Sequence, residues 1–164
     1  MSVQASSYIV LKVQETTGPL VCSASAVADY LKDDAQSSRE WFRVLYLNAK
    51  NAVILNKLEF IGTVDSSAVY PREVIVSALA CGASSLILVH NHPSGDPEPS
   101  YSDKDITKSI VFAASTMQMK VLDHVIIGAS FMGSPSRHFS FADQGLLDDY
   151  TQDALRYQQD AIKL

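Results

Sequence analysis

Apolar residues along this chain gather in short runs whose spacing matches strands in some segments and helices in others. Residues 41–48 and 53–60 are rich in β-branched and aromatic side chains and flank a polar Ala-Lys-Asn segment, which predicts a β-hairpin. Further apolar runs predict short strands at residues 8–13, 121–127 and 139–141. The run at 121–127 ends in consecutive apolar residues, so we expect this strand to be buried on both faces.

Helix-boundary residues predict two helices between these strands. Pro71 and Gly82 bracket an apolar stretch, and proline favours the first turn of a helix while glycine favours its end. Ser100 is well placed to cap a second helix over residues 102–117, with Asp103 in its first turn. We therefore expect one buried helix before the segment that begins at Ser85 and another after it.

Two other segments are predicted to be helical. Residues 25–33 follow serines, and the C-terminal segment from about Leu146 carries an apolar stripe of Leu146, Leu147, Tyr150 and Ala154. The sequence leaves open whether this stripe packs on the domain or on another subunit. Strands and helices that alternate in this order predict an α/β layer fold.

Two histidines follow directly on the apolar run 85–89. Side chains two positions apart on a strand project from the same face, so His90 and His92 should point the same way. Pro93 has no N–H for a ladder, and the strand should end there with both imidazoles at its open end. Asp103, in the first turn of the following helix, can reach back to them. Two imidazoles and one carboxylate leave a fourth tetrahedral position for water, which is typical of catalytic zinc.

The spacing of these residues resembles a known metal-binding motif. His-x-His, seven residues, Ser100, two residues and Asp103 match the JAMM motif of the JAB/MPN metallopeptidases, and the string from His90 to Gly95 resembles the RadC branch. The similarity covers about residues 25–146. It implies a three-layer α/β/α fold with a mixed sheet, related to that of cytidine deaminases, one bound Zn²⁺, and hydrolysis of peptide or isopeptide bonds.

The resemblance also implies roles for individual residues. It makes His90, His92 and Asp103 the zinc ligands, and it gives Ser100 a role in stabilising the oxyanion. Ser100 has a local explanation as well, because a helix-capping serine would occupy the same position. His124 matches a recurring family position, and we predict that it is a buried hydrogen-bonding residue that orients a ligand.

A zinc-activated water needs a general base, which the JAMM mechanism takes from an upstream glutamate. Glu40, at the start of the strand predicted at 41–48, occupies the corresponding position and is the predicted base. Two alternatives remain. Glu73 falls in the first turn of a helix, where the helix dipole already explains an acidic residue. Glu59 could be an ordinary solvent-facing strand residue.

Composition agrees with a cytoplasmic enzyme. The chain of 164 residues has single-domain length, with the similarity core at 25–146 and a helical extension at 147–164. Cys22 and Cys81 lack CxxC spacing and are predicted to be reduced, small core residues. Neither a signal peptide nor a membrane-spanning run is evident, and no helix-hairpin-helix motif precedes the core. We expect a protein or peptide substrate, such as a ubiquitin-like conjugate or a peptide tail, and the sequence leaves a non-peptide amide open as well.

Three other functions need weighing. RadC-like proteins carry a DNA-repair label, but the net charge of −5 and scattered basic residues argue against direct nucleic-acid binding. A zinc deaminase would need His-x-Glu and Pro-Cys-x-x-Cys, and the sequence has neither. A silent JAB/MPN interaction module is the third, although the complete ligand set favours catalysis.

Overall fold

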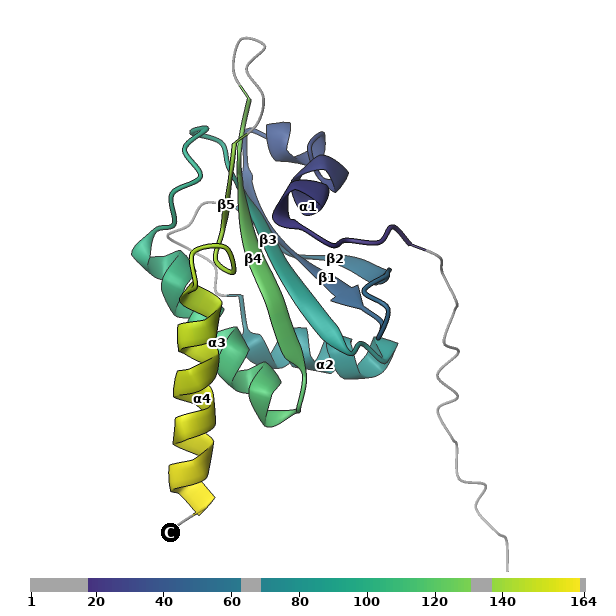
Figure 1. Cartoon of the computed structure of the whole chain (residues 1–164). Coiled ribbons are helices and arrows are strands. Elements are labelled where there is room, and N and C mark those ends of the chain that lie inside the picture. Colours follow the sequence, from purple (N-terminus) through teal and green to yellow (C-terminus); the bar gives the residue numbers. More distant parts are fainter. Residues whose placement is uncertain (1–17, 63–68, 131–136, 163–164) are drawn as a thin grey trace, which may run out of the picture.

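A mixed sheet forms the centre of the computed structural model, which describes residues 18–62, 69–130 and 137–162 (Figure 1). In the described part of the chain the sheet has five strands in the order β2-β1-β3-β4-β5. β1 (Glu40–Leu47) and β2 (Val53–Gly62) form the predicted antiparallel hairpin. β3 (Ser85–His92) is antiparallel to β1 and parallel to β4 (Lys120–Gly128), and β5 (His138–Ser140) closes the edge antiparallel to β4. The strand expected at 8–13 lies outside the described residues.

Helices cover both faces of this sheet. On one face α1 (Ala24–Tyr30) and the 3₁₀ turn η1 (Asp34–Gln36) pack over the sheet, and on the other lie α2 (Pro71–Cys81) and α3 (Tyr101–Thr116) (Figure 1). α4 (Leu146–Ile162) runs beside α3. These layers confirm the predicted three-layer α/β/α architecture with a mixed sheet.

The central strands are buried on both sides, as predicted for 121–127. Ile87 and Val89 of β3 point into the cluster beneath α1, while Leu86 and Leu88 point into the cluster beneath α2 and α3. All four have less than 5% of their surface exposed. Because parallel central strands must be covered by helices on both faces, this burial fixes the strand that carries the histidines.

The ends of α2 follow the predicted signals. Pro71 opens the helix, and Gly82 ends it in the left-handed region at φ 69°. The N–H groups of Gly82 and Ala83 donate to the carbonyls of Leu79 and Ala78, so the last turn is closed before the chain enters β3.

The C-terminal helix packs on the domain, which answers the question that its apolar stripe left open. Leu147 and Ala154 are buried, and Leu147 clusters with Val111 and Phe141. The carboxylate of Asp123 accepts hydrogen bonds from the segment that leads into this helix. Its Oδ1 accepts from the N–H of His124 at 2.7 Å and of Ala142 at 3.0 Å, and its Oδ2 accepts from the Ser140 hydroxyl at 2.7 Å.

The prediction that both cysteines are core residues is wrong. Cys22 is exposed and Cys81 is half-buried, although both are free thiols as predicted. Cys22 lies between Val21, which points inward, and Ser23, the N-cap of α1, so its own side chain points away from the sheet. Among the described residues no helix combines the length and apolar character that crossing a bilayer requires.

Candidate metal centre

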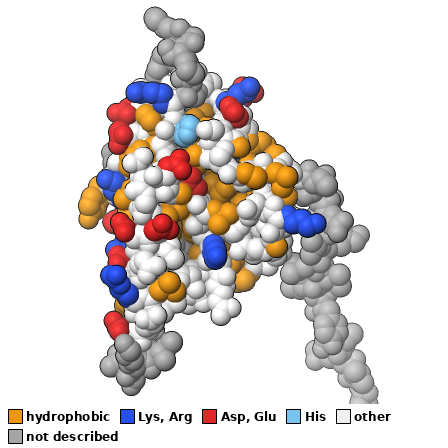
Figure 2. Space-filling view, in the orientation of Figure 1, with side chains coloured by type: hydrophobic (Ala, Val, Ile, Leu, Met, Phe, Trp, Pro, Cys, Tyr) orange, Lys and Arg blue, Asp and Glu red, His pale blue; other side chains and the backbone are white. Residues whose placement is uncertain are grey.

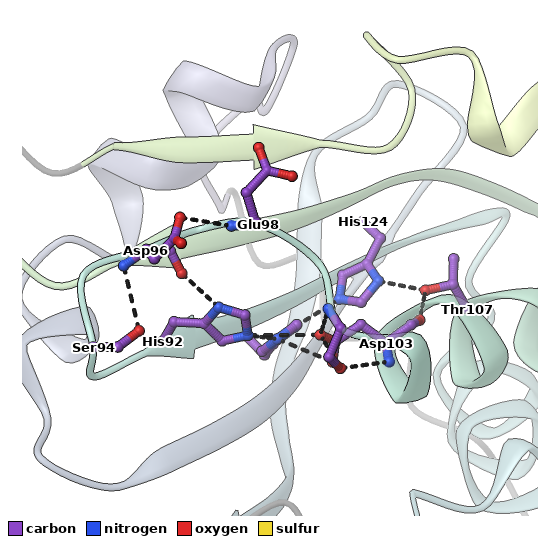
Figure 3. A network of polar contacts seen from close by, with 9 residues as sticks. His92, Ser94, Asp96, Glu98, Asp103, Thr107 and His124 are labelled. Atoms are coloured by element: carbon purple, nitrogen blue, oxygen red, sulfur yellow. Dashed lines mark hydrogen bonds and ion pairs between the residues drawn. The ribbon is translucent and has the colours of Figure 1, made fainter.

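The histidine end of β3 meets the first turn of α3, and the predicted ligand residues come together there (Figure 3). One ligand atom each of His90, His92 and Asp103 lies within 4.8 Å of the others. His90 is 5% exposed and Asp103 9% exposed, so the centre is a partly enclosed site at the end of the sheet.

The distances within this cluster suit a tetrahedral ion. His90 Nε2 lies 2.9 Å from His92 Nε2 and 3.3 Å from Asp103 Oδ1, and His92 Nε2 lies 3.6 Å from Asp103 Oδ2. Two ligand atoms that are each ~2.0–2.1 Å from one tetrahedral zinc lie about 3.3–3.4 Å apart. The His90 Nε2–Asp103 Oδ1 separation matches this value and the His90 Nε2–His92 Nε2 separation is shorter, so these residues lie close enough together to hold one metal of that size.

The imidazole of His92 is oriented by the loop that follows it. Its Nδ1 lies 2.7 Å from the carbonyl oxygen of Asp96, which can only accept, so Nδ1 carries the hydrogen. His92 Nε2 therefore faces the cluster. Burial would lower the pKa of His92, but its hydrogen bonds with Asp103 and the Asp96 carbonyl raise it above its ordinary value. A proton thus competes with a metal for this nitrogen.

Close backbone contacts hold this loop against β4. The carbonyl of His92 accepts from the N–H groups of Gly95 and Ala129, both at 3.0 Å. Gly95 has φ 81°, and a Cβ added at Gly128 would collide with the carbonyl oxygen of Gly95. Glycine at both positions allows the approach that brings the Asp96 carbonyl to His92.

Burial and charge put the other two predicted ligands in the protonation states that bind a metal. Burial lowers the pKa of His90 to about 4, so its ring is neutral at pH 7. Burial alone would raise the pKa of Asp103, but hydrogen bonding with His92 and the adjacent His90 hold it well below its usual range. A neutral imidazole and an ionised carboxylate are the forms that bind zinc.

Ser100 caps α3 as predicted and forms a complete capping box with Asp103. The Ser100 N–H and hydroxyl donate to Asp103 Oδ2 at 2.7 and 2.6 Å, and the Asp103 N–H donates back to Ser100 Oγ at 3.2 Å. This arrangement leaves Asp103 Oδ1 for a metal. The hydroxyl hydrogen is held by Asp103, so the oxyanion role of Ser100 remains a prediction that requires this hydrogen bond to be exchanged.

Glu40 lies beside the ligands. It opens β1, whose Phe42 pairs with His90, so the start of β1 runs alongside the histidine end of β3. Burial raises the pKa of Glu40, and the nearby charges of His92 and Asp103 act on it in opposite directions. Glu40, the predicted base, is therefore close enough to two of the predicted ligands for their charges to shift its pKa.

Asn91 fixes the strand start that carries Glu40, a role that the sequence did not reveal. Its side chain projects from the opposite face to the histidines and is fully buried. There Asn91 Oδ1 accepts from the Trp41 N–H at 2.8 Å, and its amide donates to the carbonyls of Ser37 and Arg39 at 3.3 Å. These contacts tie down the residues on both sides of Glu40.

The two alternative glutamates have other partners. Glu59 accepts from the Tyr46 hydroxyl at 2.7 Å and pairs with Lys57 at 2.9 Å. With its side chain only 7% exposed, Glu59 is not the solvent-facing residue considered from the sequence. Glu73 is exposed, pairs with Arg72 at 3.2 Å and lies in the first turn of α2, as its local explanation predicted.

His124 is buried and hydrogen-bonded to a ligand, as predicted. Its Nε2 lies 2.9 Å from His90 Nδ1, and its ring stacks on Phe141 with centroids 4.7 Å apart. Thr107, on α3, completes the contact at 2.6 Å from His124 Nδ1. Thr107 was not predicted from the sequence, although its position one turn after Asp103 on the predicted helix places the two on the same face.

Comparison with known proteins agrees with the resemblance seen in the sequence. A model of the RadC-like JAB domain matches residues 21–146. UPF0758 proteins of Haemophilus influenzae strains 86-028NP and PittEE are each 45% identical over 138 residues, which cover 84% of this chain and 60% of theirs. A UPF0758 protein of Actinobacillus succinogenes is 45% identical over 134 residues, covering 81% of this chain and 56% of its own length. The chain thus spans about 60% of the length of these relatives.

Proposed function

Since the chain belongs to the RadC-like JAB domain family, we propose that it is a zinc-dependent hydrolase that cleaves a peptide or isopeptide bond. The observation that carries this proposal is the His90, His92 and Asp103 cluster, whose separations fit one tetrahedral ion. Glu40 lies close enough to this cluster for the charges of His92 and Asp103 to act on it. A carboxylate in this position supports a role in hydrolysis rather than in metal storage alone.

Each residue then has a separate task in the proposed reaction. When bound, Zn²⁺ supplies positive charge that acidifies water and polarises a carbonyl group. The Glu40 carboxylate accepts the proton of the attacking water and passes it to the leaving amine, and a raised pKa suits a base that works near neutral pH. Ser100 stabilises the oxyanion once its hydroxyl leaves Asp103.

A protein or peptide is the proposed substrate, with a ubiquitin-like conjugate as one form of it. Direct nucleic-acid binding is not part of the proposal. On the face seen in Figure 2, the basic side chains stand apart from one another and alternate with acidic ones, and the net charge is −5. The expected cytoplasmic location remains a prediction.

Metal stoichiometry tests the site. Purified protein should bind close to one zinc per chain, and the His92→Ala, Asp103→Ala double variant should lose it while remaining folded. His138→Ala is the matched control, because this half-buried histidine lies on β5 outside the cluster. Equal zinc in the double variant and wild type would overturn the ligand assignment.

Substrate capture tests the reaction. A Glu40→Gln variant should retain conjugates that wild-type protein, added afterwards, cleaves to smaller products. Zinc binding without cleavage of any captured conjugate would instead favour the interaction-module alternative.

A further inference from the structure

A continuous chain of hydrogen bonds runs behind the metal centre, from α3 to the first ligand (Figure 3). It joins the carbonyl oxygen of Asp103, the Thr107 hydroxyl, both ring nitrogens of His124, and His90 Nδ1. Thr107 and His124 have no exposed surface, and Phe42 and Phe141 pack against the His124 ring. Water therefore cannot reach these groups and cannot replace any of these hydrogen-bond partners.

The direction of each hydrogen bond follows from the first acceptor. The Asp103 carbonyl cannot donate, so the Thr107 hydroxyl donates to it and must accept from His124 Nδ1–H. The Nε2 atom of a neutral His124 then has only a lone pair, and it accepts from His90 Nδ1–H. His90 is thereby left with a bare Nε2, the atom that faces Asp103.

Two other proton arrangements are disfavoured by the same contacts. If every hydrogen bond had the opposite donor and acceptor, Thr107 Oγ1 and the Asp103 carbonyl oxygen would be in close contact with no hydrogen between them. If His124 carried both hydrogens, a fully buried positive charge would have no carboxylate against either ring nitrogen.

We propose that Thr107 and His124 are positioning residues that hold His90 as its Nδ1–H tautomer, so that its Nε2 is free for a metal before one binds. In free neutral histidine the Nε2–H tautomer predominates, so the chain of hydrogen bonds reverses the intrinsic preference. The backbone carbonyl of Asp96 separately holds a hydrogen on His92 Nδ1. In the metal-free protein a protonated His92 ring can donate its Nε2–H to the bare His90 Nε2, 2.9 Å away. The advantage of this tautomer for metal binding rests on the proposed function. The tautomer itself is a property of the metal-free protein.

Nitrogen-15 NMR of the histidine side chains in metal-free protein tests the proposal without any activity. His90 and His124 should both show a protonated Nδ1 and an unprotonated Nε2. A wild-type His90 with its hydrogen on Nε2 would overturn the proposal, whatever the zinc affinity. If wild-type protein bound no zinc at all, the proposed function would fail while this measurement would still decide the tautomer.

Substitutions at Thr107 test the cause. Thr107→Val removes the hydroxyl at nearly constant volume, so His124 and then His90 should move their hydrogen to Nε2. Zinc affinity should fall about 10–100-fold, the usual effect of removing a partner that orients a ligand. Thr107→Ser should restore both the tautomer and the affinity.

Thr116→Val is the matched control. The Thr116 hydroxyl makes the same bond to a carbonyl one turn earlier on α3, at 3.0 Å from Phe112 O, but it is exposed and contacts no histidine. It should leave zinc affinity and the His90 tautomer unchanged. Equal loss of affinity in the two valine variants, or an unchanged His90 tautomer in Thr107→Val, would overturn the proposal.

Discussion

Asn91 lies between two ligand histidines in sequence, yet its side chain works on the opposite face of the sheet. By holding the Trp41 N–H and the carbonyls of Ser37 and Arg39, it fixes the backbone on either side of Glu40. The same strand therefore presents the metal ligands on one face and positions the proposed base from the other. This follows from the two-residue period of a strand.

Glu40→Gln separates the base from the ligands. The variant should keep zinc occupancy near wild type, because the proposed role of Glu40 is to act on water and not to bind the metal. Its hydrolytic rate should fall about 10²–10⁴-fold, the usual effect of losing a general base. Metal analysis and cleavage of a captured conjugate measure the two effects.

Glu73→Gln is the control for this change, because Glu73 is exposed at the start of α2. It should weaken that helix by less than about 1 kcal/mol and leave the rate unchanged. A Glu40→Gln variant that loses its zinc, or one that keeps its full rate, contradicts the assignment of Glu40 as base.

Single residues were predictable where their function follows a local pattern. Strand periodicity put His90 and His92 on one face, and the helix start put Asp103 and Ser100 in a capping arrangement. The partners of Asn91 lie some fifty positions away, across strand pairings that no local pattern specifies. The burial of Glu59 likewise depends on Tyr46, which meets it only through the register of the hairpin.

At the scale of elements, the loop after β3 is shaped by its contact with the end of β4. Gly128→Ala should push the Gly95 backbone away and with it the Asp96 carbonyl that orients His92. Overpacking of this kind typically costs about 1–3 kcal/mol, and we expect zinc affinity to fall about 10–100-fold as well. Calorimetric titration with zinc and denaturant unfolding measure the two effects.

Gly82→Ala serves as the comparison. It strains a residue at φ 69° but lies at the C-terminal end of α2, with no neighbour near the added methyl. We expect it to lower stability and to leave zinc affinity at the wild-type value. The same zinc affinity in Gly128→Ala and wild type would show that the loop does not orient His92.

The junction between β4 and α4 should respond to pH through Asp123. Burial raises the pKa of this carboxyl, although three hydrogen bonds oppose the shift. As pH rises from about 4, the unfolded chain releases this proton first, so the free energy of unfolding falls until the folded group also ionises. Asp123→Asn keeps a carbonyl acceptor and lacks this loss.

As pH rises above about 4, the free energy of unfolding of Asp123→Asn should therefore increase relative to that of the wild type. Urea unfolding of both proteins across pH 4–7 measures it, and the contributions of other groups cancel in the difference. A difference that stays constant with pH would contradict the raised pKa.

Elements were predicted well where their ends carry specific residues. Pro71, Gly82 and Ser100 set helix boundaries through backbone geometry and hydrogen bonding, which are local effects. The order of the strands, with β3 between β1 and β4, was not predicted, because it depends on pairing between segments that are distant in sequence. The exposure of Cys22 could not be predicted, because an isolated apolar residue before a helix has no periodicity to orient it.

At the scale of the whole molecule, the acidic balance predicts weak binding to DNA. Backbone affinity depends on clustered Lys and Arg that displace counterions, and this chain carries 13 basic and 18 acidic residues. Binding to duplex or single strands should be weak at physiological salt and strongly suppressed by added salt. A gel-shift assay across salt concentrations measures it, and tight salt-resistant binding would favour the DNA-linked alternative.

The three proposed metal ligands all lie within residues 90–103, on one strand end and the helix that follows it. A metal there closes only a short loop, and the entropy removed by closing a loop grows slowly with its length. The pairing of β1 with β3, by contrast, joins segments that are distant in sequence. The ion would therefore stabilise only the local structure around it, and the protein should retain its sheet when a chelator removes the metal. Exchange of one metal for another then becomes a reversible event within an already assembled scaffold.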